Sequence, residues 1–284
     1  MAVPEVIKNA DEMQARARGL LKAGKSLGFV PTMGALHAGH TSLIERARRE
    51  NQVVVVSIYV NPTQFGPGED FERYPRTFEA DRRICAKAGV DIIFAPETLY
   101  APDARTWVQV GLLGEPLCGM SRPGHFRGVA TVVTKLLSIV RPDRAYFGRK
   151  DAQQLLIIAT LARDLHLGCQ IVPCETVRET DGLALSSRNR YLSPQQRKQA
   201  LAIPSALEYC REQVLKGERD AMKLLGEMAE ILIQQPNLEI DYIAAVDAHT
   251  LEDLQTLAGD VLVAIAAKVG ATRLIDNTCF EGLE

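Results

Sequence analysis

Short apolar runs alternate with amphipathic segments along the first 175 residues. Apolar and β-branched runs predict strands at 26–30, 53–60, 90–94, 145–147 and 171–173. Apolar residues at helical spacing predict helices at 39–50, 77–88, 128–140 and 151–166. The run at 53–60 is too apolar for an edge strand, which favours a central position in a parallel sheet. The alternation of strands and helices predicts an α/β fold with a Rossmann-like, doubly wound parallel sheet.

The pattern changes after about residue 180. Two long amphipathic segments predict helices at 194–216 and 220–235, and three apolar runs predict strands at 240–246, 261–267 and 273–276. This pattern is typical of a smaller C-terminal α+β domain. We therefore expect two domains, at 1–178 and 179–284. In a doubly wound sheet, ligands bind at the carboxyl ends of the strands, near the point where the strand order reverses.

Composition excludes some classes of protein but does not indicate a particular function. The 284 residues are 46% hydrophobic and 24% charged, with a net charge of −2. A nearly neutral chain gives no general reason to expect nucleic acid or an anionic membrane as a partner. No apolar run approaches the roughly 20 residues of a membrane span, and the N-terminus lacks a signal-peptide core. The six cysteines show no C-x-x-C spacing, which favours reduced thiols in the cytoplasm, although an even number leaves a disulfide framework formally open.

The sequence PTMGALHAGH, at 31–40, lies between a predicted strand and a predicted helix. Main-chain N–H groups and the helix dipole favour phosphate at such a turn. Two glycines, Gly34 and Gly39, allow a ligand to approach the backbone closely. His37 and His40 share one face of the first helical turn, where imidazoles can donate to phosphate oxygens. Zinc is the rival use of such a pair, but it would need a third ligand, and no H-E-x-x-H is present.

Five sequence blocks together carry a family resemblance. The H-x-G-H sequence resembles the HIGH signature of the nucleotidylyltransferase superfamily, and the whole first block resembles the pantoate–β-alanine ligase family. The other four blocks are VNPTQF at 60–65, RPGHFRGV at 122–129, FGRKDAQQ at 147–154 and LSSRN at 185–189. RLIDN at 273–277 extends the resemblance towards the C-terminus. Five blocks in register are far more specific than any one of them.

The resemblance implies that ATP and Mg²⁺ are used and assigns residues to ATP. The implied catalytic residues are His40, His37, Lys150 and Arg188. The implied ATP-binding residues are Pro31, Thr32, Met33, Gly34, His37, Gly39, His40, Gly148, Lys150, Asp151, Val177, Leu185, Ser186, Ser187 and Arg188. The last three resemble the KMSKS loop of the superfamily, which makes 179–284 the expected lid domain. The family usually has Glu where this chain has Arg149, so the role of that position is open.

The resemblance also assigns residues to pantoate and β-alanine. The implied contacts are Gln64, Asn61, Gln154, Val132, Val133 and Leu136. The last three would face the gem-dimethyl group of pantoate, and their apolar character also suits an ordinary helix core. Asp81 would lie near Mg²⁺, and its alternative is a solvated carboxylate on a helix face. Arg122 and His125 would lie near the anionic substrates, or else be an ordinary surface arginine and a capping histidine.

Phosphate-binding donors and cations suit attack by a carboxylate on the α-phosphorus of ATP, and no motif for a covalent protein nucleophile is present. The resemblance implies that the resulting acyl adenylate reacts with β-alanine and that the enzyme is a homodimer. Three alternatives stay open. An adenylyltransferase would stop at nucleotidyl transfer. A tRNA synthetase would need an anticodon-binding module, which this short, near-neutral chain does not show. A nucleotide sensor would need broken motifs.

Overall fold

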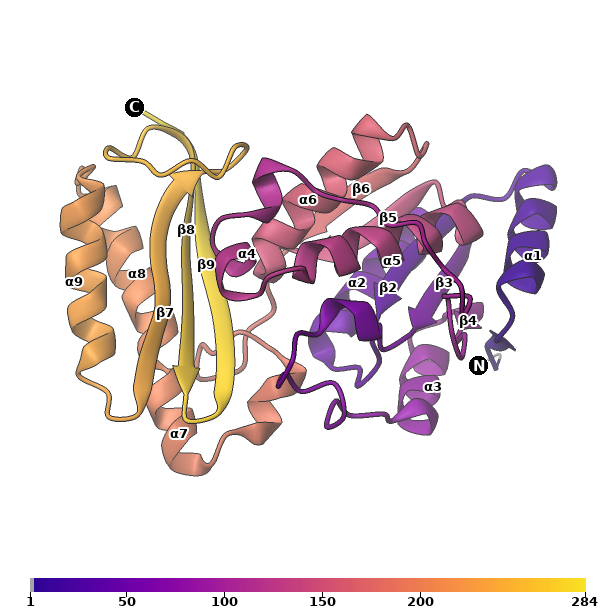
Figure 1. Cartoon of the computed structure of the whole chain (residues 1–284), viewed down its shortest axis with the longest axis horizontal. Helices are drawn as coiled ribbons and strands as arrows, with labels where there is room; N and C mark the ends of the chain where they lie inside the picture. The colour runs from indigo at the N-terminus through magenta and orange to yellow at the C-terminus, as the bar shows by residue number, and fades with distance from the viewer. Residues whose placement is uncertain (1–2) are drawn as a thin grey trace. The chain divides into compact units, whose positions relative to one another are not determined.

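A computed structural model describes residues 3–284, which divide into two compact units. The N-terminal unit (Figure 1) comprises the described residues up to Gly114, together with Arg122–Arg149 and Gln153–Glu175. The C-terminal unit comprises Glu115–Ser121, Lys150–Ala152 and Thr176–Glu284. Two short segments, 115–121 and 150–152, thus belong to the C-terminal unit although the chain on both sides of them belongs to the other. The domain boundary at 178/179 stays a prediction.

The N-terminal unit is built on a six-stranded sheet in which every described pairing is parallel. The strand order is β1-β4-β3-β2-β5-β6. The strands are β1 (Glu5–Ile7), β2 (Leu27–Thr32), β3 (Val53–Ile58), β4 (Ile92–Phe94), β5 (Arg144–Gly148) and β6 (Gln170–Cys174). The chain builds outwards from β2 to β3 and β4, and then from β2 to β5 and β6 on the other side. This arrangement confirms the doubly wound sheet and places its switch point between β2 and β5.

Helices cover the sheet because each buries an apolar stripe. In α2 (Ala38–Glu50) the buried residues Leu43, Ile44 and Ala47 recur at helical spacing. The other helices of this unit are α1 (Ala10–Lys22), α3 (Phe78–Lys87), α5 (His125–Val140) and α6 (Ala152–Asp164). Short 3₁₀ turns lie at η1 (Pro62–Gln64), η2 (Leu112–Gly114) and η3 (Arg149–Asp151). The sequence pattern missed β1 and α1, because charged residues obscure their short apolar stripes.

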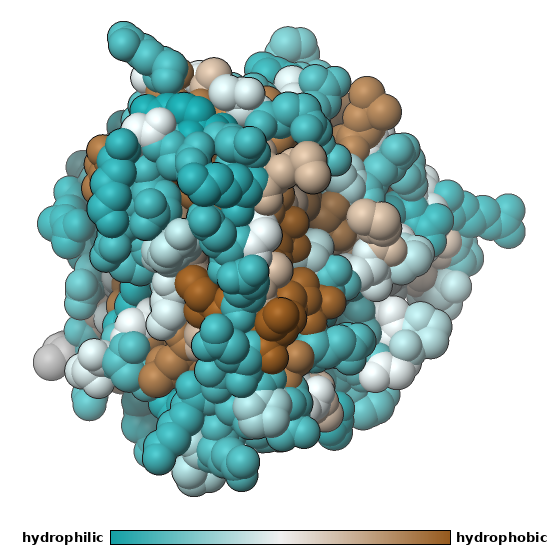
Figure 2. Space-filling model, turned by 90° about the vertical axis from the view of Figure 1, so that its left-hand side faces the viewer, coloured by the Kyte–Doolittle hydropathy of each residue, from teal (hydrophilic) through white to brown (hydrophobic). Residues whose placement is uncertain are grey.

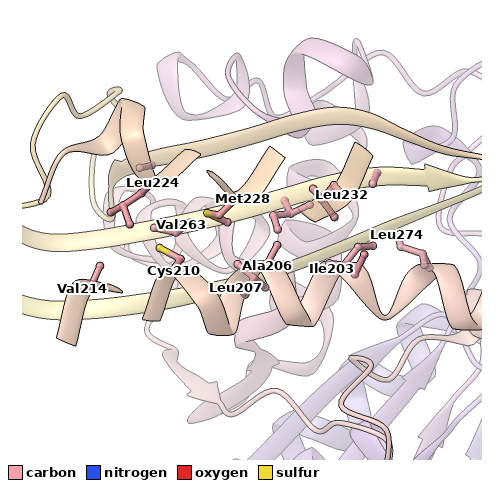
Figure 3. Close-up of a cluster of buried hydrophobic side chains, with 14 of the residues drawn as sticks. Ile203, Ala206, Leu207, Cys210, Val214, Leu224, Met228, Leu232, Val263 and Leu274 are labelled. Atoms are coloured by element: carbon pink, nitrogen blue, oxygen red, sulfur yellow. The ribbon is translucent and has the colours of Figure 1, made fainter. Parts of the chain in front are cut away.

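The C-terminal unit packs helices on a three-stranded antiparallel sheet of β7 (Leu238–Asp247), β8 (Gly259–Val269) and β9 (Thr272–Leu283). Its helices are α4 (Cys118–Ser121), α7 (Pro194–Ala200), α8 (Ala202–Leu215) and α9 (Ala221–Ile233), with η4 at Ser187–Tyr191. Side chains from α8, α9 and the sheet interdigitate in one buried core (Figure 3). The α+β architecture of this part is therefore confirmed.

One predicted helix is in fact two. The pattern predicts a single helix over 194–216, but α7 ends at Ala200 and α8 begins at Ala202. Pro204 explains the break, because its ring lacks an N–H and would clash with the carbonyl of Ala200 in a continuous helix. Proline is tolerated in the first turn of α8, where no intrahelical partner is lost.

Most of the surface shown in Figure 2 is hydrophilic. Hydrophobic residues gather near the centre of this face. The exposed large hydrophobic side chains of α9 are Met222 and Ile233. Within residues 3–284, no helix is both long enough and apolar enough to cross a bilayer.

Candidate active site

The turn after β2 is held in an unusual backbone conformation. Gly34 and Ala35 have φ angles of 82° and 51°, in the left-handed region. A Cβ at residue 34 would lie 3.0 Å from Asp81 Oδ2 and 3.1 Å from Ile58 Cγ2, so glycine is needed for space as well as conformation. Thr32 Oγ1 accepts from the Gly34 N–H at 3.1 Å and donates to the Ser57 carbonyl at 2.7 Å. These bonds fix the turn to the ends of β2 and β3.

His37 and His40 form a reciprocal cap at the start of α2. His37 Nδ1 accepts from the Gly39 N–H at 3.2 Å, and His40 Nδ1 accepts from the His37 N–H at 3.3 Å. The ring centroids are 4.1 Å apart. Because each Nδ1 is an acceptor, the proton of each neutral ring lies on Nε2. The cap therefore produces two neighbouring Nε2–H donors at a helix N-terminus, where anions bind.

The Asp81 carboxylate is hydrogen-bonded to the main chain of this turn. The residue is only 1% exposed. Asp81 Oδ2 accepts from the Ala35 N–H at 3.0 Å and Oδ1 from the Leu36 N–H at 2.8 Å. The Thr77 hydroxyl lies 3.2 Å from both oxygens. The solvated carboxylate that the sequence left as an alternative is therefore wrong, because α3 turns this residue inwards.

The Asp81 carboxylate also fits poorly as a metal ligand. Its two oxygens already accept from two N–H groups and a hydroxyl, which leaves little capacity to bind a cation as well. Among residues 3–284, no group of three or more His, Cys, Asp or Glu side chains could hold a metal ion. Metal contact at Asp81 stays a prediction, and the geometry favours a role in holding the turn.

Gln64 is the last residue of η1, the 3₁₀ turn that follows β3. Both polar atoms of its side-chain amide contact neighbouring residues. Gln64 Oε1 accepts from Asn61 Nδ2 at 3.0 Å, and its Nε2 lies 3.3 Å from Met33 Sδ. The structure thus places Gln64 beside Met33, the first residue of the turn after β2. Asn61 is 1% exposed, and its Nδ2 also donates to the Gly128 carbonyl at 3.2 Å. Asn61 therefore supports Gln64, while its direct contact with substrate stays a prediction.

A phenol hydroxyl completes the support of Asn61. Asn61 Oδ1 accepts from the Tyr100 hydroxyl at 2.9 Å and from Thr63 Oγ1 at 3.0 Å. Burial raises the pKa of Tyr100, which keeps the phenol protonated and able to donate. The amide of Asn61 is consequently fixed in one orientation.

Arg122 and His125 hold the main chain of Gln64. His125 Nδ1 lies 2.8 Å from the Gln64 carbonyl, and Arg122 Nη1 lies 2.9 Å from His125 Nε2. Arg122 binds Glu69 through two hydrogen bonds of 2.6 and 2.8 Å. Burial opposes ionisation of Glu69, but the bonds from Arg122 outweigh it and lower the pKa of Glu69. From the sequence, Arg122 and His125 were predicted either to contact substrate or to be a surface arginine and a capping histidine. Nothing in the sequence indicated that they contact the main chain of Gln64.

The apolar residues assigned to pantoate lie on α5. Val132, Val133 and Leu136 are 4–5% exposed, so most of their surface contacts the protein. The same helix approaches η1 closely at Gly128, where a Cβ would lie 2.2 Å from the Thr63 carbonyl oxygen. This contact fixes α5 against the segment that carries Gln64. Contact of the three side chains with pantoate stays a prediction.

The turn after β5 carries the second group of predicted residues. Gly148 ends β5, and η3 presents Arg149, Lys150 and Asp151. Lys150 Nζ lies 3.7 Å from Asp151 Oδ1, and its side chain is 18% exposed. Arg149, whose role the sequence left open, pairs with the exposed Glu175 at 3.1 Å. Gln154 is half-buried in the first turn of α6.

The third group of predicted residues, at 177 and 185–188, lies in the C-terminal unit. The Leu185 N–H donates to the Val177 carbonyl at 3.0 Å, which places these two predicted residues side by side. Ser186 caps η4, with its Oγ accepting from the Arg188 N–H at 3.3 Å. Ser187 and Arg188 follow in the same turn. Their hydroxyls and guanidinium provide donors of the kind that bind phosphate.

A cavity of about 350 Å³ opens beside the β2 turn. Its wall includes Met33, Gly34 and Asp81 from the predicted site, and Pro62 beside Asn61. Arg76 also lines it, although no motif pointed to this residue. Gln64, Gln154 and the apolar α5 residues are not part of its wall. The cavity is large enough for a small organic acid.

The comparisons with known proteins agree on one family. A family model described as pantoate-beta-alanine ligase matches residues 5–279. The chain is 53% identical over 275 residues to the pantothenate synthetase of Thermotoga neapolitana, covering 96% of this chain and 98% of that protein. It is 55% identical over 269 residues to the pantothenate synthetase of Moorella thermoacetica, covering 94% and 93%.

Solved structures agree as well. The pantothenate synthetase of Thermus thermophilus superposes with a TM-score of 0.91 at 46% identity, covering 96% of this chain and 98% of that one. The pantoate-beta-alanine ligase of Francisella tularensis, complexed with beta-gamma ATP and beta-alanine, gives a TM-score of 0.78 at 35% identity over 97% of both chains. This chain therefore belongs to the pantoate–β-alanine ligase family and is a ligase that joins pantoate to β-alanine.

Proposed function

We propose that the ligase works through a pantoyl adenylate. A carboxylate oxygen of pantoate attacks the α-phosphorus of ATP, and the bond from phosphorus to the pyrophosphate oxygen breaks. The amine of β-alanine then attacks the acyl carbon, loses a proton and expels AMP. The capped pair of His37 and His40 carries this proposal, because it presents two Nε2–H donors at a helix N-terminus.

The histidines act on charge that develops at phosphorus. Nonbridging oxygens and the pyrophosphate gain negative charge as the P–O bond breaks, so donors already in place stabilise the transition state. His40 is the proposed catalytic imidazole, with His37 beside it at a ring separation of 4.1 Å. Main-chain groups at Pro31–Gly34 and Gly39 bind the nucleotide beside them.

Cations neutralise the phosphates, and hydroxyls donate hydrogen bonds to them. We assign this role to Lys150, Ser186, Ser187 and Arg188, and binding of the rest of ATP to Gly148, Asp151, Val177 and Leu185. Lysine is a compact point charge suited to phosphate, and arginine binds it through a planar fork. Mg²⁺ is proposed to arrive with ATP as part of the substrate, and to share the phosphate charge.

Gln64 is the proposed contact for pantoate and β-alanine. Its amide can donate and accept, which suits a hydroxy acid, and the contacts of Asn61 and Met33 hold its orientation. We propose that the substrate pocket is completed by Asn61, Gln154, Val132, Val133 and Leu136.

We also propose that the enzyme is a homodimer and that it works in the cytoplasm. The six cysteines, all within the described residues, form no disulfide with one another, and free thiols of this kind are the usual state in a reducing compartment.

AMP formation tests the proposed reaction. The protein is incubated with MgATP and pantoate, with and without β-alanine, and pyrophosphate–ATP exchange is measured without β-alanine. We expect sustained AMP release only with both substrates, exchange with pantoate alone, and loss of both activities in His40→Ala. Removing one well-placed donor should cost on the order of 3 kcal/mol of barrier, or about 10²-fold in rate. Sustained pyrophosphate release that does not depend on β-alanine would contradict the proposal and indicate a simple adenylyltransferase, which transfers AMP to its substrate and stops there.

A further inference from the structure

Strand β9 contains two adjacent polar residues that are almost fully buried. Asp276 is 3% exposed and Asn277 is 8% exposed. Burying such groups is unfavourable unless they are hydrogen-bonded, so their partners indicate why they are there. Successive side chains of a strand point to opposite faces, so the two residues serve different neighbours.

Asn277 binds the main chain of the proposed phosphate-binding lysine. Its Nδ2 donates to the carbonyl oxygen of Lys150 at 2.9 Å, across 127 positions of sequence. Lys150 lies in η3, a single 3₁₀ turn between the end of β5 and the first residue of α6. Fixing this carbonyl fixes the peptide plane and therefore the direction in which the lysine side chain leaves the backbone.

Asp276 holds the segment that leads to the KMSKS-like residues. Its carboxylate accepts two hydrogen bonds from Arg178, at 2.6 and 3.0 Å. Arg178 also donates to the Gly182 carbonyl at 3.1 Å and pairs with Ala184 in an isolated β-bridge. The ion pair therefore stabilises the turn immediately before 185–188.

The two residues are also coupled to each other. The Asn277 N–H donates to Asp276 Oδ1 at 2.8 Å, so the same carboxylate orders both the arginine and the asparagine backbone. One point of β9 thus contacts two parts of the chain that carry proposed phosphate ligands. Both parts belong to the C-terminal unit.

We propose that Asp276 and Asn277 are positioning residues that hold Lys150 and the 185–188 segment in fixed geometry for their action on the triphosphate. The inference rests on the proposed function of Lys150. Neither residue is assigned a contact with substrate. Because a displacement of about 1 Å in a catalytic group can cost about 10²-fold in rate, loss of the Asn277 bond should lower kcat more than it alters the KM for β-alanine.

The principal variant is Asn277→Leu, which removes the donor at similar side-chain size. The matched control is Thr278→Val on the same strand. Thr278 is similarly buried, at 5%, and its Oγ1 accepts from Arg211 at 2.6 Å. We expect kcat to fall 10- to 100-fold in Asn277→Leu and less than threefold in Thr278→Val, at a temperature well below both melting points. If the leucine variant does not fold, Asn277→Ser removes the same contact with less steric change.

A double-mutant cycle with Lys150→Met separates positioning from general structural damage. If Asn277 acts through Lys150, Asn277→Leu should cause little further loss of kcat in the Lys150→Met background. Independent losses that multiply would overturn the inference, and so would wild-type kcat in the single Asn277 variant. Both outcomes leave the proposed function intact as long as Lys150→Met is impaired. Full activity of Lys150→Met would instead overturn the proposed role of the lysine, and the inference with it.

Discussion

Asp81→Asn tests whether the buried carboxylate holds the β2 turn or binds metal. In the wild-type protein each carboxylate oxygen accepts one main-chain N–H, from Ala35 or from Leu36. Asparagine keeps one oxygen but presents an NH₂ group to the other N–H. One charge-assisted hydrogen bond is lost, and a buried donor is left without an acceptor.

The expected loss of stability follows from those two changes. A hydrogen bond to a charged group contributes about 1.5–3 kcal/mol, and an unsatisfied buried donor costs about 1–3 kcal/mol. The two effects overlap, so we expect a loss of about 3 kcal/mol in the free energy of unfolding. That loss corresponds to a decrease in Tm of about 6–12 °C for a chain of this size. Relaxation of the turn should displace His37 and His40 and lower kcat about 10²-fold.

The assay combines thermal melting with AMP formation over a range of Mg²⁺ concentrations. Glu79→Gln is the matched control, because it makes the same chemical change on α3 at a side chain that is 73% exposed. We expect Asp81→Asn to melt earlier and lose kcat, with an unchanged Mg²⁺ concentration for half-maximal rate. A variant that melts like the wild type but needs several-fold more Mg²⁺ would refute the reasoning and indicate a metal ligand.

Three further results are expected. Gly128→Ala should lower the free energy of unfolding by about 1–3 kcal/mol in chemical denaturation, because the new Cβ would meet the Thr63 carbonyl oxygen at 2.2 Å; unchanged stability would contradict this close packing. Gln64→Leu should raise the KM for pantoate at least tenfold and leave the KM for ATP within threefold in steady-state assays, whereas the reverse pattern would contradict its assignment. Burial raises the pKa of Cys210 to about 11, so alkylation at pH 7 should spare this thiol until the protein unfolds, as peptide mass spectrometry can check; rapid labelling of the native protein would count against its burial.

The sequence by itself determined the alternation of elements and indicated where the proposed phosphate-binding turn lies. Apolar periodicity located the strands and helices around 26–60, and the glycine-rich block at 31–40 fell between a strand and a helix, where phosphate binds. These features are local, since a turn and a helix cap depend on residues a few positions apart. The pairing of His37 with His40 is local in the same way, because their spacing of three residues alone places both rings on one face of the first helical turn.

Only the tertiary structure decided which side chains support the site. Asp81 contacts the turn across 45 and 46 positions of sequence, His125 reaches Gln64 across 61, and Asn277 reaches Lys150 across 127. No periodicity records such pairs, because the chain has to fold before a donor meets its acceptor. Burial then removes water as a competitor, so the same carboxylates and amides that look solvated in a sequence become the groups that hold a turn in place.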